Sequence, residues 1–142
     1  MERSLSVLLP VENAQATLAK QVRRLLDVLP ELTSDLELLV IDDGSTDATI
    51  EVADELATQY PQVRVLRNST TAGRTRAIQA GIRNSRGEFL LLIDDDSTLP
   101  IDEIRHLWQA TIQHSIVLGR LPRQSAYDPN RFRRLDGPSH GK

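Results

Sequence analysis

The chain contains the run Phe89-Leu90-Leu91-Leu92-Ile93-Asp94-Asp95-Asp96. Five consecutive apolar residues in so short a run are typical of a strand that is buried on both faces of a sheet. Three carboxylates follow the strand, and adjacent anions have to stay solvated, pair with cations or bind a metal. The run therefore predicts a buried strand whose carboxyl end is a candidate site for a divalent cation and, through that cation, a phosphate.

Polar residues follow two earlier apolar runs in the same way. Residues 4–9 and 36–41 are predicted strands, and they lead into Pro10-Val11-Glu12-Asn13 and into Asp42-Asp43-Gly44-Ser45-Thr46-Asp47. In a parallel sheet, the carboxyl ends of the strands lie along one edge, and ligands bind outside that edge. The sequence therefore predicts that the three polar segments converge on a single site.

The rest of the chain supplies the helices that a parallel sheet requires. Apolar residues recur at helical spacing in residues 18–29, 47–60, 73–85 and 101–113, and apolar runs at 63–66 and 115–118 predict two further strands. This alternation predicts an α/β fold with three layers, α/β/α, around a mainly parallel sheet. The predicted domain spans residues 1–119, and residues 120–142 form a basic tail containing Pro and Gly that is expected to be flexible.

Composition excludes several classes of function. A length of 142 residues fits a single domain, and the absence of cysteine excludes disulfides, zinc–thiolate sites and cysteine nucleophiles. A formal net charge of −3 gives no general reason to expect nucleic-acid or membrane binding. Without a signal peptide or a membrane-spanning run, the chain is expected to be cytoplasmic. No Gly-x-Gly-x-x-Gly follows the first strand, which argues against a dinucleotide site.

Each polar segment also has a purely structural interpretation. Asp42–Asp47 has the composition of a strand-to-helix turn with a helix cap, and Asp94–Asp96 could be a solvated loop before a cap at Ser97 or Thr98. The helix start at Gly73-Arg74 could meet a phosphate through its N–H groups and guanidinium, or the arginine could simply be solvated. The structural interpretation is weakest for Asp94–Asp96, because a helix cap needs one carboxylate and not three.

Four segments carry a resemblance to a known family. In chain order they are Leu5-Ser6-Val7-Leu8-Leu9-Pro10-Val11-x-Asn13, Leu38-Leu39-Val40-Ile41-Asp42-Asp43-Gly44-Ser45-Thr46-Asp47, Ala72-Gly73-Arg74-x-x-Ala77-x-x-x-Gly81-x-x-x-Ser85-x-Gly87-Glu88, and Leu91-Leu92-Ile93-Asp94-Asp95-Asp96. In order and spacing they resemble the nucleotide-binding half of the family 2 glycosyltransferases, which have the Rossmann-like GT-A fold. The resemblance covers about residues 4–119.

The resemblance implies a nucleotide-sugar site built from the first three segments. Pro10-Val11-Glu12 would line the pocket for the base, and Asp43 would bond to the base. Gly73-Arg74 would lie near the base or the diphosphate. Glu12 departs from the family pattern, which often has an aromatic or aliphatic residue at this position.

The resemblance makes Asp94-Asp95-Asp96 the DXD motif of the family. Asp96 would ligate Mn²⁺ or Mg²⁺ directly, and Asp94 or Asp95 would reach the metal shell or the ribose. A cation held there would neutralise the charge that develops on the diphosphate leaving group. The expected reaction is an inverting hexosyl transfer from a UDP- or GDP-linked donor to an acceptor that the sequence does not identify.

A second function stays open at this point. In the family, the acceptor site and the catalytic base follow the DXD motif in a second half, whereas only 46 residues follow Asp96 here. The chain is therefore expected to be truncated after its fifth strand. The alternative to an active glycosyltransferase is a non-catalytic or incomplete nucleotide-sugar-binding module, which a partner chain or an oligomer could complete.

Overall fold

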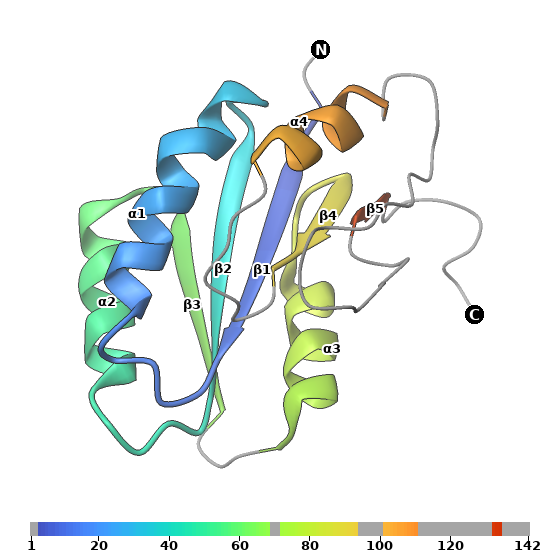
Figure 1. Cartoon of the computed structure of the whole chain (residues 1–142). Helices are drawn as coiled ribbons and strands as arrows, with labels where there is room; N and C mark the ends of the chain where they lie inside the picture. Colours follow the sequence, from blue (N-terminus) through green and yellow to red (C-terminus); the bar gives the residue numbers. More distant parts are fainter. Residues whose placement is uncertain (1–2, 69–71, 94–100, 111–131, 135–142) are drawn as a thin grey trace.

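The computed structural model describes residues 3–68, 72–93, 101–110 and 132–134. Within these residues there are four α-helices, one short 3₁₀ helix and one β-sheet. The strands are β1 (Leu5–Val11), β2 (Leu36–Asp43), β3 (Val63–Asn68), β4 (Phe89–Leu92) and β5 (Phe132–Arg134). The helices are α1 (Leu18–Val28), the short 3₁₀ helix η1 (Leu29–Glu31), α2 (Thr49–Gln59), α3 (Arg74–Asn84) and α4 (Ile101–Ala110). Strands and helices alternate from β1 to α4, as the apolar patterns predict (Figure 1).

The sheet has the strand order β3-β2-β1-β4-β5. Its first four strands are parallel: Pro10 lies opposite Ile41, and Leu8 lies opposite Leu92. The carboxyl ends of β1, β2 and β4 therefore meet at one edge, with β1 between the other two. The predicted α/β fold with a mainly parallel sheet is confirmed.

One strand was not expected from the sequence. β5 pairs with β4 in the antiparallel direction, with Leu90 opposite Arg133. Phe132-Arg133-Arg134 contains no apolar run, so the pattern that identifies buried strands is absent from it. β5 lies within residues 120–142, and the predicted strand at 115–118 lies outside the described residues, so the division into a domain and a tail stays a prediction.

Helices cover both faces of the sheet (Figure 1). The larger core packs α1, α2 and α4 against one face, and Trp108 of α4 lies edge-on to Phe89 with 5.5 Å between ring centroids. The Trp108 indole N–H donates to the Leu32 carbonyl at 3.0 Å, which holds α4 to the segment after η1. The smaller core packs α3 against the other face through Ala77, Leu8 and Ile41. Successive residues of each strand thus alternate between two helical layers, as a sheet buried on both faces requires.

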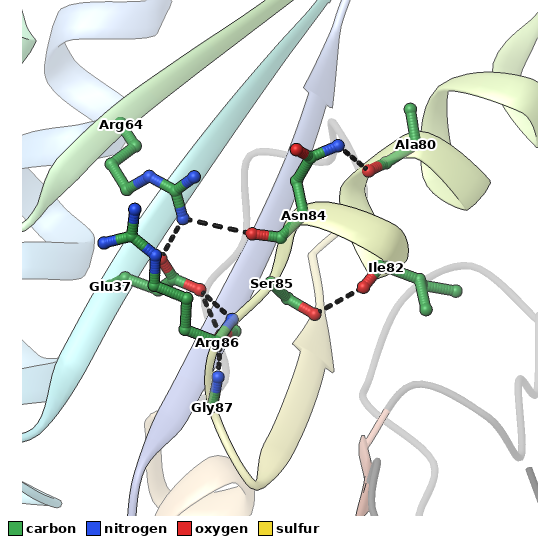
Figure 2. A network of polar contacts seen from close by, with 9 residues as sticks. Glu37, Arg64, Ala80, Ile82, Asn84, Ser85, Arg86 and Gly87 are labelled. Carbon is green, nitrogen blue, oxygen red and sulfur yellow. Dashed lines mark hydrogen bonds and ion pairs between the residues drawn. The ribbon is translucent and has the colours of Figure 1, made fainter.

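A polar network closes the amino-terminal edge of the sheet (Figure 2). The Glu37 carboxylate accepts hydrogen bonds from the Ser6 hydroxyl at 2.5 Å, the Arg86 N–H at 2.7 Å and the Arg64 guanidinium at 2.5 Å. The Gly87 N–H donates to the Ser6 hydroxyl oxygen at 2.8 Å. The network joins β1, β2, β3 and the turn before β4, at the end of the sheet opposite the predicted site.

Candidate functional site

A pocket opens at the carboxyl edge of the sheet, on the α3 side. Its volume is about 320 Å³, and the residues that line it are Pro10, Val11, Glu12, Asp43, Gly73, Arg74 and Ala77. The family resemblance implies a nucleotide-sugar site that includes the first six of these residues. The structure brings all six together, although they come from three segments that lie far apart in the chain.

The pleat of the strands explains why these side chains meet. Leu8 in β1 and Ile41 in β2 pack under α3, so the residues two positions further along each strand, Pro10 and Asp43, continue on the α3 side. There the helix begins at Arg74, and the floor of the pocket is the buried Ala77. The pocket thus continues the smaller core outward, past the carboxyl ends of β1 and β2.

Asp43 fixes the segment that precedes α3. Its carboxylate is only 5% exposed, and it accepts hydrogen bonds from the N–H groups of Ala72 at 2.9 Å and Gly73 at 3.2 Å, and from the Asn68 side-chain amide at 3.2 Å. Burial favours the neutral acid, but these three donors outweigh it and hold the pKa of Asp43 below its ordinary value. Asp43 therefore stays ionised at neutral pH and forms one wall of the pocket.

The start of α3 supplies the positive side of the pocket. Gly73 has φ = +98°, a conformation that favours glycine, and its carbonyl accepts the first helical hydrogen bond, from the Ala77 N–H at 3.0 Å. The N–H groups at a helix start carry a partial positive charge, and Arg74 adds a guanidinium at the same point. This end of the pocket is suited to an anionic group such as a phosphate.

Two loops beside the pocket are joined by the residue after Glu12. Asn13 has φ = +53°, and its side-chain oxygen accepts hydrogen bonds from the N–H groups of Thr46 at 2.9 Å and Asp47 at 3.3 Å. Its own N–H donates to the Ser45 hydroxyl at 2.8 Å. Asn13 thus holds the β1–α1 loop to the β2–α2 loop, a role that sequence reasoning missed. The only signal was its place in the Pro10–Asn13 segment, because its partners lie more than 30 residues away.

The acidic residues at the end of β2 and in the turn after it have different environments. The Asp47 carboxylate accepts hydrogen bonds from the N–H and hydroxyl of Thr49, the first residue of α2. These bonds, with the hydroxyl contributing most, lower the pKa of Asp47. The N-cap residue is Ala48, so Asp47 stabilises the turn into the helix and does not occupy the cap position that the sequence suggested for it. Asp42 points to the opposite face from Asp43 and is 4% exposed, and its Oδ1 has no hydrogen-bond partner within the described part of the chain.

The predicted metal ligands, Asp94 and Asp96, and the neighbouring Asp95 lie outside the described residues. The last described residue before them is Ile93, whose N–H donates to the Leu8 carbonyl at 3.0 Å. Leu8 is two residues before Pro10, so the described part of the chain that follows β4 lies beside β1. Within the described ranges, no group of three or more His, Cys, Asp or Glu side chains is placed to hold a metal ion.

The chain matches known proteins over most of its length. It matches the family model for glycosyl transferase family 2 over residues 6–139. It is 31% identical over 134 residues to a dolichyl-phosphate beta-glucosyltransferase, ALG5A, of Trichomonas vaginalis, an alignment that covers 86% of this chain and 42% of that protein. The chain spans less than half the length of the curated relatives that it matches.

Two solved structures share the fold. The mannosyltransferase PcManGT from Pyrobaculum calidifontis, in complex with GDP-Man and Mn²⁺, matches with a TM-score of 0.66 and 21% identity over 87% of this chain and 37% of that one. S. aureus TarS residues 1–349, in complex with UDP-GlcNAc, matches with a TM-score of 0.65 and 18% identity over 92% of this chain and 45% of that one. This likeness agrees with the predicted GT-A architecture. None of the helices in the described ranges is long and apolar enough to span a membrane.

Proposed function

Because the chain belongs to glycosyl transferase family 2, we propose that it binds the nucleoside diphosphate of a sugar donor in the pocket between β1, β2 and α3, and that it serves in transfer of the sugar to an acceptor. The observation that supports the proposal is that six residues from three separate segments line one pocket: Pro10, Val11, Glu12, Asp43, Gly73 and Arg74. The base would lie against Pro10–Glu12 and Asp43, and the diphosphate would lie toward the start of α3.

The negative charge of a diphosphate favours placing it toward the start of α3, where the pocket is positive. The donor carries negative charge before transfer, and the leaving nucleoside diphosphate gains more as the glycosidic bond breaks. Groups already oriented toward that charge stabilise the transition state. The hydrogen bonds that Asp43 accepts from the N–H groups of Ala72 and Gly73 hold the backbone that leads into the start of α3.

We propose a divalent cation, Mn²⁺ or Mg²⁺, at the end of β4. Asp94-Asp95-Asp96 offers hard carboxylate oxygens, which both cations prefer, and it follows a strand end adjacent to β1. Asp96 and Asp94 are the proposed ligands, with Asp95 directed to the ribose. When bound, the cation supplies positive charge to the leaving diphosphate.

Calorimetric titration of the chain with UDP and with GDP, each with and without Mn²⁺, tests the donor site. We expect binding that depends on Mn²⁺ and that weakens at least about tenfold in Asp96→Ala, because the cation bridges protein and diphosphate. Glu55→Ala, on the exposed side of α2, is the control and should bind as the wild type does. Metal-independent binding, or unchanged affinity in Asp96→Ala, would contradict the proposed cation site.

Activity assays then separate the two functional classes. Release of free sugar from UDP-glucose or GDP-mannose, or transfer of the sugar to an added acceptor, would identify an enzyme. Donor binding without turnover would identify a nucleotide-sugar-binding module. The catalytic base is not assigned.

A further inference from the structure

Glu12 places a second carboxylate beside Asp43 in the wall of the pocket. The register of β1 and β2 ends at the pair Val11 and Asp42, and Glu12 is the first residue after β1. Adjacent strands lie about 5 Å apart, so Glu12 follows the end of β1 next to the end of β2 that carries Asp43. Both residues line the pocket.

The two carboxylates differ in what they already bind. Asp43 is buried and accepts three hydrogen bonds from Asn68, Ala72 and Gly73. Glu12 is exposed, and across the described ranges its carboxylate makes no hydrogen bond or ion pair. Among the described residues, then, the Glu12 carboxylate has no hydrogen-bond donor, and it lines the pocket.

A base that fits beside these groups must present donors. An ionised carboxylate only accepts hydrogen bonds. Guanine has two adjacent donors on one edge, N1–H and the 2-amino group, whereas uracil has one N–H between two carbonyl oxygens. A uracil carbonyl would face a carboxylate without a proton between them, a contact that costs affinity.

We propose that Glu12 makes the pocket selective for guanine nucleotides, by accepting a hydrogen bond from the 2-amino group while the base lies against Asp43. This inference rests on the proposed function and specifies the donor as a GDP-sugar.

A cation bridging Glu12 and Asp43 explains the pair less well. Three N–H donors already surround the Asp43 carboxylate, and the described residues contain no third His, Cys, Asp or Glu placed to complete a metal site. Donor groups of a base edge satisfy both carboxylates without further protein ligands.

Titration with three nucleoside diphosphates tests the role of Glu12. IDP is GDP without the 2-amino group, so the ratio of the two affinities measures that group alone. With Mn²⁺ present, we expect the wild type to bind GDP about tenfold more tightly than IDP or UDP, since a hydrogen bond to a charged group contributes about that factor. In Glu12→Ala, GDP and IDP should bind within about twofold of each other, while the affinity for IDP stays near its wild-type value.

The controls separate this inference from the function on which it rests. Glu55→Ala should keep the wild-type ratios, and thermal unfolding of each variant reports whether it is folded. Equal binding of GDP and IDP by the wild type, UDP binding as tight as GDP binding, or an equal loss of GDP and IDP affinity in Glu12→Ala would refute selection by Glu12 and leave the donor site standing. If the folded wild type bound no nucleoside diphosphate, the proposed function and the inference would both be wrong.

Discussion

At the scale of single residues, the carboxylates of the segment Asp42–Asp47 have different environments and different hydrogen-bond partners. Asp43 holds the loop before α3, Asp47 accepts a hydrogen bond from the Thr49 N–H in the turn into α2, and Asp42 is buried on the other face of the sheet. The pleat separates Asp42 from Asp43, because neighbouring residues of a strand point to opposite faces. The composition of an acidic run therefore identifies a site only after the strand register assigns each side chain to a face.

Glu37 is the carboxylate on which acid stability depends at the other edge of the sheet. Burial opposes its ionisation, but hydrogen bonds from Ser6, the Arg86 N–H and Arg64 outweigh burial, so its pKa lies below the ordinary value. The ordinary value, about 4.3, applies to the unfolded chain. Ionised Glu37 thus stabilises the fold above about pH 4.3, and the contribution is lost as the pH falls through the lower pKa of the folded state.

Glu37→Gln should remove that pH dependence. We expect the variant to be less stable than the wild type by about 2 kcal/mol near pH 7, because the buried donors lose a charged acceptor. The difference should shrink as the pH is lowered from about 5 to about 3. Urea unfolding at several pH values measures it, with Glu55→Gln as the control for loss of an exposed charge. A difference that is constant with pH would contradict this assignment.

At the scale of elements, the site depends on how one loop is held to the next. The Pro10–Glu12 wall ends at Asn13, and Asn13 bonds to Ser45, Thr46 and Asp47. A further bond joins the Ala14 N–H to the Thr49 hydroxyl at 2.7 Å. The distance between the first wall of the pocket and Asp43 is therefore set by contacts between loops and by the β1–β2 register together.

Substitution of Asn13 tests that dependence. Asn13→Gly keeps the positive φ accessible but removes the acceptor oxygen, whereas Asn13→Asp keeps an acceptor. We expect Asn13→Gly to lose about 1 kcal/mol of stability and to bind nucleoside diphosphate several-fold more weakly, and Asn13→Asp to bind close to the wild type. Calorimetry and thermal unfolding on the same samples give both values. Normal affinity in Asn13→Gly would show that the loop contact does not shape the pocket.

At the scale of the whole molecule, β1 joins the two halves of the sheet. It lies between β2 and β4, and all seven of its residues are buried. At the amino edge the connection is close: a Cβ added at Gly87 would lie 2.6 Å from the Ser6 backbone nitrogen and 2.8 Å from the Leu5 carbonyl carbon. Backbone atoms cannot move aside as a side chain can, so this position requires glycine.

Gly87→Ala should therefore weaken the whole domain. We expect a loss of about 2 kcal/mol or more in unfolding free energy, since overpacking against backbone displaces β4 from β1. Arg86→Ala, the adjacent exposed side chain, should unfold close to the wild type. Denaturant unfolding of both variants measures their unfolding free energies. If Gly87→Ala were as stable as Arg86→Ala, the added Cβ would be accommodated without a loss of stability, which would contradict this prediction.

The sequence predicts much of this architecture, and the parts it misses share a physical cause. Apolar runs and helical spacing are local signals, and they identify β1 to β4 and the four α-helices. The Glu37 network, the Asn13 contacts and β5 depend on partners that lie far away in the chain, and no local pattern encodes them. Topology predicts that the polar strand ends share one edge of the sheet, and the resemblance to the family implied that these residues and the helix start at Gly73-Arg74 form one site.

The hydrogen bonds of Asp43 have a consequence for how donor preference can change during evolution or by engineering. A substitution of Asp43 would disturb the loop before α3 as well as any contact to a base. At that position, a change in base preference would therefore also change the shape of the pocket. Glu12 makes no such contact within the described residues. On the proposed donor site, Glu12 is the position at which a substitution would change the preferred nucleotide while the framework stays intact.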